Sequence, residues 1–124
     1  MIDFKHLYKA FGYSMNGIKH AFTYDQNLRI HTTIALLVII FSIVLHVTPF
    51  EKGLLGVVMV QVIVTEMINT AIENMVDLIT KEHREEARIA KDVASGMVLI
   101  TAISAVIIGL LVFLPYIFRL LVTV

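Results

Sequence analysis

Four polar residues recur along an otherwise apolar stretch of the chain: Glu66, Asn69, Glu73 and Asp77. On a helix they lie at about 0°, −60°, −20° and +20°, so they share one face within an arc of about 80° and extend ~16 Å along the axis. Carboxylate and amide oxygens in such a row can hold a divalent cation or accept a proton from a hydroxyl group. The row is therefore the first candidate for a functional site.

The composition indicates that this helix lies in a membrane. Of 124 residues, 58% are hydrophobic and the mean hydropathy is +0.86, which is more apolar surface than a soluble domain of this size can bury. The formal net charge of +0 excludes a nucleic-acid binder driven by phosphate attraction. Without cysteine there is no disulfide framework and no thiolate metal site. Ionisable groups inside a membrane span are costly, so the polar row requires a function or a partner.

Three apolar segments are long enough to cross a ~30 Å hydrocarbon core. They cover residues about 29–47, 50–80 and 88–114. Thr48, Pro49 and Glu51 form a capping box that starts the second segment. Pro115 ends or kinks the third. The polar row thus lies on the second of three predicted transmembrane helices.

The first segment, about residues 2–24, has a different pattern. Its apolar residues recur every three or four positions, with Lys, His and Asn between them: Phe4, Leu7, Tyr8, Phe11, Met15, Ile18 and Phe22. This pattern predicts an amphipathic helix that lies in a membrane surface. We therefore expect an all-α integral membrane protein, a single domain over residues 1–124 with one surface helix and three transmembrane helices.

Lys and Arg are unevenly distributed between the two sides of the membrane. Four precede the first span and four lie between the second and third, against one in the first loop and one after the third: Lys5, Lys9, Lys19, Arg29, then Lys81, Arg84, Arg88, Lys91, against Lys52 and Arg119. The positive-inside rule places the N-terminus and the second loop in the cytoplasm. The polar row then opens toward the cytoplasm at one end.

Further acids lie at the same membrane level. Asp25 precedes the first span, and Asp92 begins the third beside the basic loop. Carboxylates for Mg²⁺, cations for phosphates and a deeper carboxylate, Glu66, as base for an alcohol would suit phosphoryl transfer. The chain has no G-x-x-x-x-G-K-[ST] loop, which excludes a P-loop nucleotide site. Periodicity and charge alone indicate only a membrane protein with a polar, cytoplasm-facing site.

Two motifs add a resemblance. "EMINTAIENMVD", followed about a dozen residues later by "AKDVASG", resembles the signature of the prokaryotic diacylglycerol kinase family, which includes the undecaprenol kinases. The likeness extends over nearly the whole chain. It implies a lipid kinase of the bacterial cell membrane that uses ATP and Mg²⁺. It also implies a homotrimer whose active sites form between subunits.

The resemblance implies roles for individual residues. Glu66 matches the catalytic base and Asn69 the amide beside it, both next to the lipid substrate. Asp25 and Glu73 match the acids that hold the metal on ATP. The positions that match nucleotide contacts are His6, Tyr13, Asp25, Glu73, Asp77, Glu82, His83, Arg84, Lys91 and Asp92.

Three positions qualify the match. Asp25 stands where the family generally has Glu, which is one methylene longer, and His6 stands where Arg is common. His31 resembles the Gram-positive branch, in which undecaprenol is the usual substrate, whereas the other branch often has an acid there. We therefore expect undecaprenol as the substrate, with diacylglycerol as the alternative.

Two functions of other classes stay open. A small proton- or cation-conducting oligomer would also need an intramembrane Glu. Its path would require polar groups outward from Glu66, where only Gln61 is present, about 140° away on the helix. A purely structural subunit would use the polar row as a helix–helix contact, and Glu66→Gln would then leave function intact.

Overall fold

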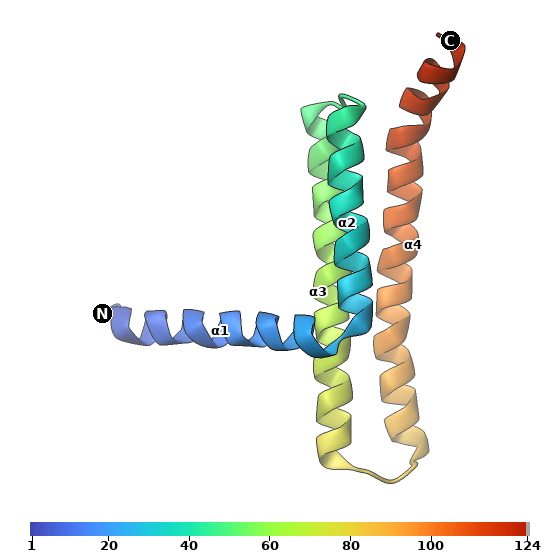
Figure 1. The fold of residues 1–124 in the computed structure, drawn as a ribbon. Coiled ribbons are helices and arrows are strands. Elements are labelled where there is room, and N and C mark those ends of the chain that lie inside the picture. Colours follow the sequence, from blue (N-terminus) through green and yellow to red (C-terminus); the bar gives the residue numbers. More distant parts are fainter. Residues whose placement is uncertain (124) are drawn as a thin grey trace.

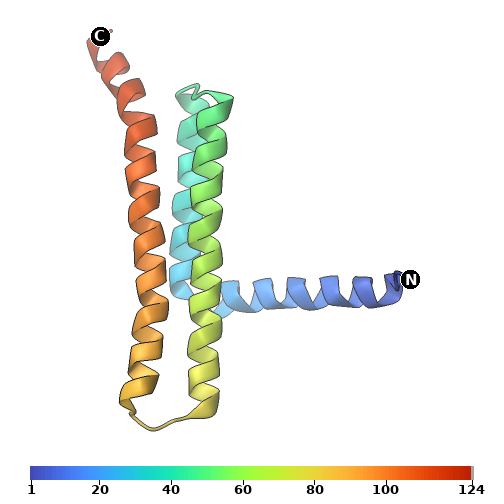
Figure 2. The same cartoon turned by 180° about the vertical axis from the view of Figure 1, so that it is seen from behind.

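The computed structural model describes residues 1–123, and within them the chain forms four helices joined by short connections. They are α1 (Phe4–Tyr24), α2 (Gln26–Val44), α3 (Pro49–Ile79) and α4 (Glu85–Val122). Figure 1 shows α2, α3 and α4 side by side, with α1 leaving the bundle sideways, and Figure 2 shows the same from behind. The predicted all-helical architecture with three helices long and apolar enough to cross a membrane is confirmed.

The three bundle helices differ in length, and this difference creates two unlike ends. α2 has 19 residues, or about 28 Å, close to the ~30 Å of a hydrocarbon core. α3 has 31 residues and α4 has 38, so both are longer than one crossing requires. Both continue past the level of α1 to their connection at residues 80–84, here called the loop end (Figure 1). The α2–α3 connection at residues 45–48 is called the far end.

One residue makes the corner between α1 and α2. Asp25 is the C-cap of α1 and the N-cap of α2, where its Oδ1 accepts hydrogen bonds from the backbone N–H groups of Asn27 (2.8 Å) and Leu28 (3.2 Å). Leu28 is fully buried, with 0% of its surface exposed. An Asp side chain satisfies the free N–H groups of a helix start, so the chain can change direction within one residue.

At the far end, the predicted capping box is present. The backbone N–H of Thr48 donates to Glu51 Oε2 (3.1 Å), and the N–H of Glu51 donates to Thr48 Oγ1 (3.3 Å). The hydroxyl of Tyr116 on α4 donates to the same Glu51 oxygen (2.6 Å). The start of α3 is thereby joined to α4.

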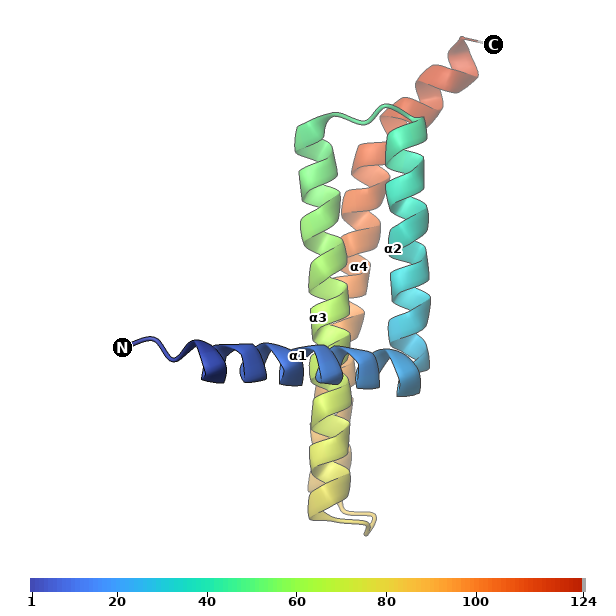
Figure 3. The ribbon, with the colours of Figure 1, turned by 60° about the vertical axis from the view of Figure 1, so that its left-hand side comes forward.

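The third predicted span is longer than expected. α4 begins at Glu85 and continues through Pro115 to Val122, and Figure 3 shows its C-terminal part leaning away from the bundle. Proline lacks the N–H for one helical hydrogen bond and its ring crowds the preceding turn, which bends a helix. Here the sequence after Pro115 is apolar and remains helical, so the proline bends α4 and does not end it.

The core of the bundle is small and lies toward the far end. Val47, Leu55 and Val112 are buried together there. Nearer the middle, the hydroxyls of Thr65 on α3 and Thr101 on α4 lie 2.9 Å apart in a hydrogen bond between helices. An apolar groove of about 710 Å³ runs between α2, α3 and α4. Much of the apolar surface faces outward, as a helix in contact with lipid requires.

Candidate active site

Two residues of the polar row are buried in α3. Glu66 is 1% exposed and Asn69 is 7% exposed. Within residues 1–123, Glu66 Oε2 and Asn69 Oδ1 have no hydrogen-bond partner. Buried polar atoms of native proteins are nearly always hydrogen-bonded, because an unpaired one is costly. These two oxygens are therefore available to bond with a ligand, with water or with another chain.

Glu73 continues the row one turn further along α3. Asn69 Nδ2 donates to Glu73 Oε1 at 3.2 Å, so the amide positions the carboxylate four residues away. Glu73 itself is exposed, in contrast to Glu66. The row thus changes from buried to open over two helical turns, in the direction of the loop end.

Asp25 reaches this row from the α1–α2 corner. Its Oδ2 accepts a hydrogen bond from Thr70 Oγ1 on α3, while its Oδ1 caps α2. Thr70 directly follows Asn69 and lies one helical turn from both Glu66 and Glu73 on α3. The structure therefore brings Asp25 to the polar row that carries Glu66, Asn69 and Glu73.

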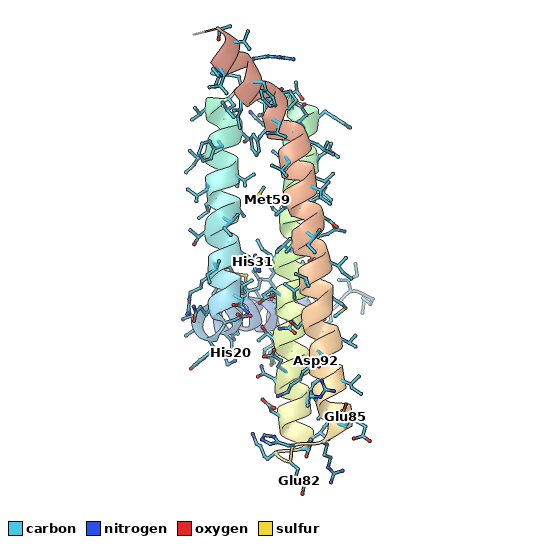
Figure 4. The ribbon with its side chains drawn as sticks, turned by 90° about the vertical axis from the view of Figure 1, so that its right-hand side faces the viewer. His20, His31, Met59, Glu82, Glu85 and Asp92 are labelled. Carbon is cyan, nitrogen blue, oxygen red and sulfur yellow. The ribbon has the colours of Figure 1, made fainter. Side chains whose placement is uncertain are left out.

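His31 on α2 lines the apolar groove, and Figure 4 shows it on the side toward α3 and α4. On α3 the lining residue nearest the polar row is Val62, one helical turn before Glu66. The polar row therefore begins where the lining of the groove ends.

The polar row and Asp25 do not form a closed metal cage. Within residues 1–123, no group of three or more His, Asp or Glu side chains could hold a metal ion. Mg²⁺, however, commonly binds to one or two carboxylates and completes its shell with water and substrate phosphates. Asp25 and Glu73 are carboxylates, which are oxygen donors of that type. Asn69 Oδ1, which has no hydrogen-bond partner among the described residues, is a further oxygen donor on the same row. The donor set fits Mg²⁺ that is held jointly with a phosphate.

A second group of predicted residues lies toward the loop end. Lys91 Nζ on α4 donates to Asp77 Oδ1 on α3 at 2.6 Å. Both line a cleft of about 530 Å³ between the two helices and their connection. The basic residues of this cleft are Lys81, Arg84, Arg88 and Lys91. Several cations around one cleft provide donors for phosphate oxygens.

The loop acids are paired with neighbouring arginines. Arg84 donates to Glu82 from Nε (3.0 Å) and Nη2 (2.9 Å). Arg88 Nη1 donates to Asp92 Oδ2 at 2.9 Å, and the same guanidinium also contacts Glu85. Figure 4 shows Glu82 and Glu85 at the loop end, and Asp92 further along α4. His83 also lines the cleft.

The predicted contacts on α1 lie apart from both groups in the single chain. α1 leaves the bundle sideways (Figures 1 and 2), and His6 and Tyr13 lie 19 and 12 residues before Asp25, which is about 28 and 18 Å along the helix axis. Tyr13 is 72% exposed. One subunit therefore does not bring these two residues to its own polar row.

Sequence reasoning missed the partner of Asp25, because the Thr70 hydroxyl on α3 donates to its Oδ2. Arg88 was expected among the cations of the basic loop, and the structure adds Glu85 and Asp92 as its partners, three and four positions away on one helix. The contact between Asp25 and Thr70 depends on how the α1–α2 corner packs against α3, which a helix pattern does not specify.

Comparisons with known proteins agree with these features. Residues 12–113 match the family model described as prokaryotic diacylglycerol kinase. A diacylglycerol kinase of Synechocystis is 39% identical over 114 residues, which are 91% of this chain and 65% of that protein. An undecaprenol kinase of Bacillus subtilis is 34% identical over 91% of this chain and 92% of its own. A diacylglycerol kinase of Escherichia coli K12 is 36% identical over 84% of this chain and 85% of its own.

These matches bear on the predictions from sequence. The resemblance carried by the two motifs is confirmed, and so is the enzyme class, since these relatives are lipid kinases. They give no support to the alternative of a proton- or cation-conducting oligomer. The chain spans about two thirds of the Synechocystis protein and nearly all of the Bacillus subtilis one.

Proposed function

Because the chain belongs to the prokaryotic diacylglycerol kinase family, we propose that it transfers the γ-phosphoryl group of ATP to the hydroxyl of undecaprenol. The observation that carries the proposal is the Glu66 carboxyl group, 1% exposed and with Oε2 unpaired among the described residues. It lies one helical turn beyond Val62, which lines the apolar groove, and one turn before Thr70, which contacts Asp25 at the α1–α2 corner. A lipid hydroxyl in the bilayer can approach such a group without leaving the headgroup region.

The residues of α3 then have distinct roles in the reaction. Glu66 accepts the proton of the lipid hydroxyl, whose oxygen bonds to the γ-phosphorus. The bond from the γ-phosphorus to the bridging β–γ oxygen breaks, and ADP leaves with that electron pair. Asn69 orients the Glu73 carboxylate through its 3.2 Å hydrogen bond and retains a free oxygen toward the reacting groups.

Asp25 and Glu73 are the residues that would hold Mg²⁺. When bound, the ion neutralises charge on the β- and γ-phosphates that the carboxylates would otherwise repel. Both donors are fixed from within the chain, Asp25 by the start of α2 and by Thr70, and Glu73 by Asn69. Positioning the donors in advance is what such a site requires, because phosphoryl transfer depends on alignment and charge.

The cleft at the loop end is the proposed nucleotide site. Lys91 lies on the side of the cleft nearest the acidic row and is held there by Asp77. Arg84 and His83 lie nearer the loop, with Glu82 and Asp92 as partners of the neighbouring arginines. The remaining proposed contacts, His6 and Tyr13, would come from another subunit. This division supports the homotrimer with shared sites that the family resemblance implies.

We place the loop end in the cytoplasm and α1 in the cytoplasmic membrane surface. α2 alone is about as long as the hydrocarbon core is thick, and α1 leaves the bundle where α2 begins. The lysines of the exposed α1 helix and the basic residues of the loop end then share the side that the positive-inside rule predicts. ATP would reach the cleft from water, and the lipid would reach Glu66 from the bilayer.

Undecaprenol is preferred over diacylglycerol for two reasons. His31, which matches the undecaprenol branch in the resemblance, lines the apolar groove whose α3 side reaches Val62, one helical turn before Glu66. The Bacillus subtilis undecaprenol kinase also matches this chain over nearly its full length. Diacylglycerol is the second candidate, because the Synechocystis and Escherichia coli relatives carry that name at 39% and 36% identity.

The test is phosphoryl transfer from labelled ATP by the purified protein in lipid micelles, with undecaprenol and diacylglycerol offered side by side. Glu66→Gln keeps the size of the side chain and removes its proton acceptor, so transfer should be lost. Glu86→Gln, the same change on an exposed residue of α4, is the matched control and should transfer normally. Preference for diacylglycerol would overturn the substrate assignment. Transfer to neither lipid, or full activity of Glu66→Gln, would overturn the mechanism.

A further inference from the structure

We propose that Thr70 is a positioning residue that fixes the Asp25 carboxylate for the metal ion. The inference rests on the proposed function, because it deepens the role given there to Asp25. Thr70 lies on α3 between Asn69 and Glu73 and is half-buried. Its hydroxyl is the donor that joins the α1–α2 corner to the polar row.

The Thr70 hydroxyl has two acceptors within reach and one proton. Its Oγ1 contacts Asp25 Oδ2 and also lies 3.1 Å from the backbone oxygen of Glu66. A hydroxyl donates one hydrogen bond, and a bond to an ionised carboxylate is about twice as strong as one between neutral groups. The proton therefore goes to Asp25, and the hydrogen bond crosses from α3 to the start of α2.

Asp25 is consequently held by both oxygens. Oδ1 accepts from the N–H groups of Asn27 and Leu28, and Oδ2 accepts from Thr70. Each carboxylate oxygen offers about two lone pairs, so Oδ2 can bind a cation while it accepts the Thr70 proton. Without Thr70, only the helix cap would fix the group, and Oδ2 would be free to turn.

The placement matters more for Asp than for a longer acid. Asp25 has one methylene less than Glu, so its carboxylate oxygens reach a shorter distance from the backbone. A hydrogen bond that directs Oδ2 toward the row compensates for the shorter reach. Partners that orient metal ligands in this way typically change metal affinity or activity by about 10- to 100-fold when they are removed.

The experiment measures metal binding without relying on catalysis. Mn²⁺ binding to the full-length protein is followed by electron paramagnetic resonance with a non-hydrolysable ATP analogue present. Thr70→Val keeps the shape and removes the hydroxyl, and we expect Mn²⁺ affinity to fall about tenfold or more. Thr70→Ser restores the hydroxyl and should restore affinity. Thr33→Val is the matched control, since the Thr33 hydroxyl bonds only to Arg29 O of its own helix (2.8 Å).

A structural role for Thr70 gives a different pattern. In an Asp25→Asn background, Thr70→Val should cause little further loss of Mn²⁺ affinity, because the two changes act on one ligand. The proposal would be overturned if Thr70→Val lowered Mn²⁺ affinity equally in both backgrounds. It would also be overturned if Thr70→Val bound Mn²⁺ as tightly as wild type, or if Thr70→Ser did not restore the affinity. If Thr70→Val does not fold, Thr70→Ala removes the same hydroxyl with less bulk.

The proposed function can fail separately. If wild-type protein binds Mn²⁺ and nucleotide but phosphorylates neither lipid, the lipid assignment fails while the role of Thr70 stands. If wild-type protein binds no Mn²⁺ with the nucleotide analogue, there is no metal for Asp25 to hold, and the positioning role is overturned.

Discussion

Lys91 Nζ and Asp77 Oδ1 lie 2.6 Å apart in an ion pair that joins α4 to α3 at the proposed nucleotide cleft. The side chains are 38% and 51% exposed, and exposed ion pairs contribute little to stability. The pair therefore contributes less as a link between the helices than by holding the Lys91 ammonium group in place. In the proposed site, ATP phosphates would take over part of the bonding that Asp77 supplies.

Replacing Lys91 should affect nucleotide binding more than anything else. Lys91→Met removes one charged hydrogen bond to phosphate, so we expect the KM for ATP to rise about tenfold or more while the KM for the lipid stays near its original value. Steady-state kinetics at varied ATP and fixed lipid measures both. Lys52→Met at the far end is the matched control. An unchanged KM for ATP would show that Lys91 does not contact the nucleotide.

Asp25 combines two roles that substitution can separate. Asn is about as good an N-cap as Asp, so Asp25→Asn should keep the α1–α2 corner and lose metal binding and activity. Asp25→Ala should lose both activity and the cap, and its free energy of unfolding should be lower by about 1 kcal/mol.

Reversible unfolding in mixed micelles, together with Mg²⁺-dependent transfer, distinguishes the two Asp25 variants. Equal stability of Asp25→Ala and wild type would contradict the capping role. Substantial activity of Asp25→Asn would instead show that the negative charge is not required for the metal.

The helices could be predicted from the sequence because each depends on local signals. The hydropathy of three segments, the box at Thr48 and Glu51, and Asp25 before the first span indicate where helices begin. For the third span the sequence left open whether Pro115 ends or kinks the helix, and in the structure α4 continues through it to Val122. The choice depends on packing at the far end, where Tyr116 is bonded to Glu51.

The sequence predicted those features of the site that lie within one helix, but not the contacts between helices. The spacing of Glu66, Asn69 and Glu73 follows from helical geometry, and the structure agrees with their shared row. Which residues of α2 meet this row depends on the angle and register of two packed helices. For this reason the sequence did not predict that Thr70 is the partner of Asp25, because the two residues are 45 positions apart and lie on different elements.

Tyr116 should stabilise the far end without affecting catalysis. Its hydroxyl donates to Glu51 at 2.6 Å and accepts from the N–H of Thr48 at 3.3 Å. Tyr116→Phe removes the hydroxyl that makes both hydrogen bonds, so it should lower the free energy of unfolding.

Two measurements test this expectation. The free energy of unfolding of Tyr116→Phe is compared with that of wild type in the same micelles, and the transfer rate of both proteins is measured at saturating substrates. Tyr8→Phe on exposed α1 is the control, because Tyr8 is 81% exposed. A marked fall in the transfer rate of the folded Tyr116→Phe protein would show that the far end is coupled to the site.

His31 should influence which lipid is used, because it lines the apolar groove whose α3 side reaches Val62, one helical turn before Glu66. His31→Glu adds a negative charge to the lining of this groove, and should reduce transfer to undecaprenol relative to diacylglycerol several-fold. His31→Gln removes the imidazole without adding charge, so it separates the effect of the acid from the loss of the ring. The measurement is the ratio of the two labelled lipid products when both lipids compete in one micelle. If His31→Glu leaves this ratio unchanged, lipid choice is made elsewhere along the groove, by its apolar side chains.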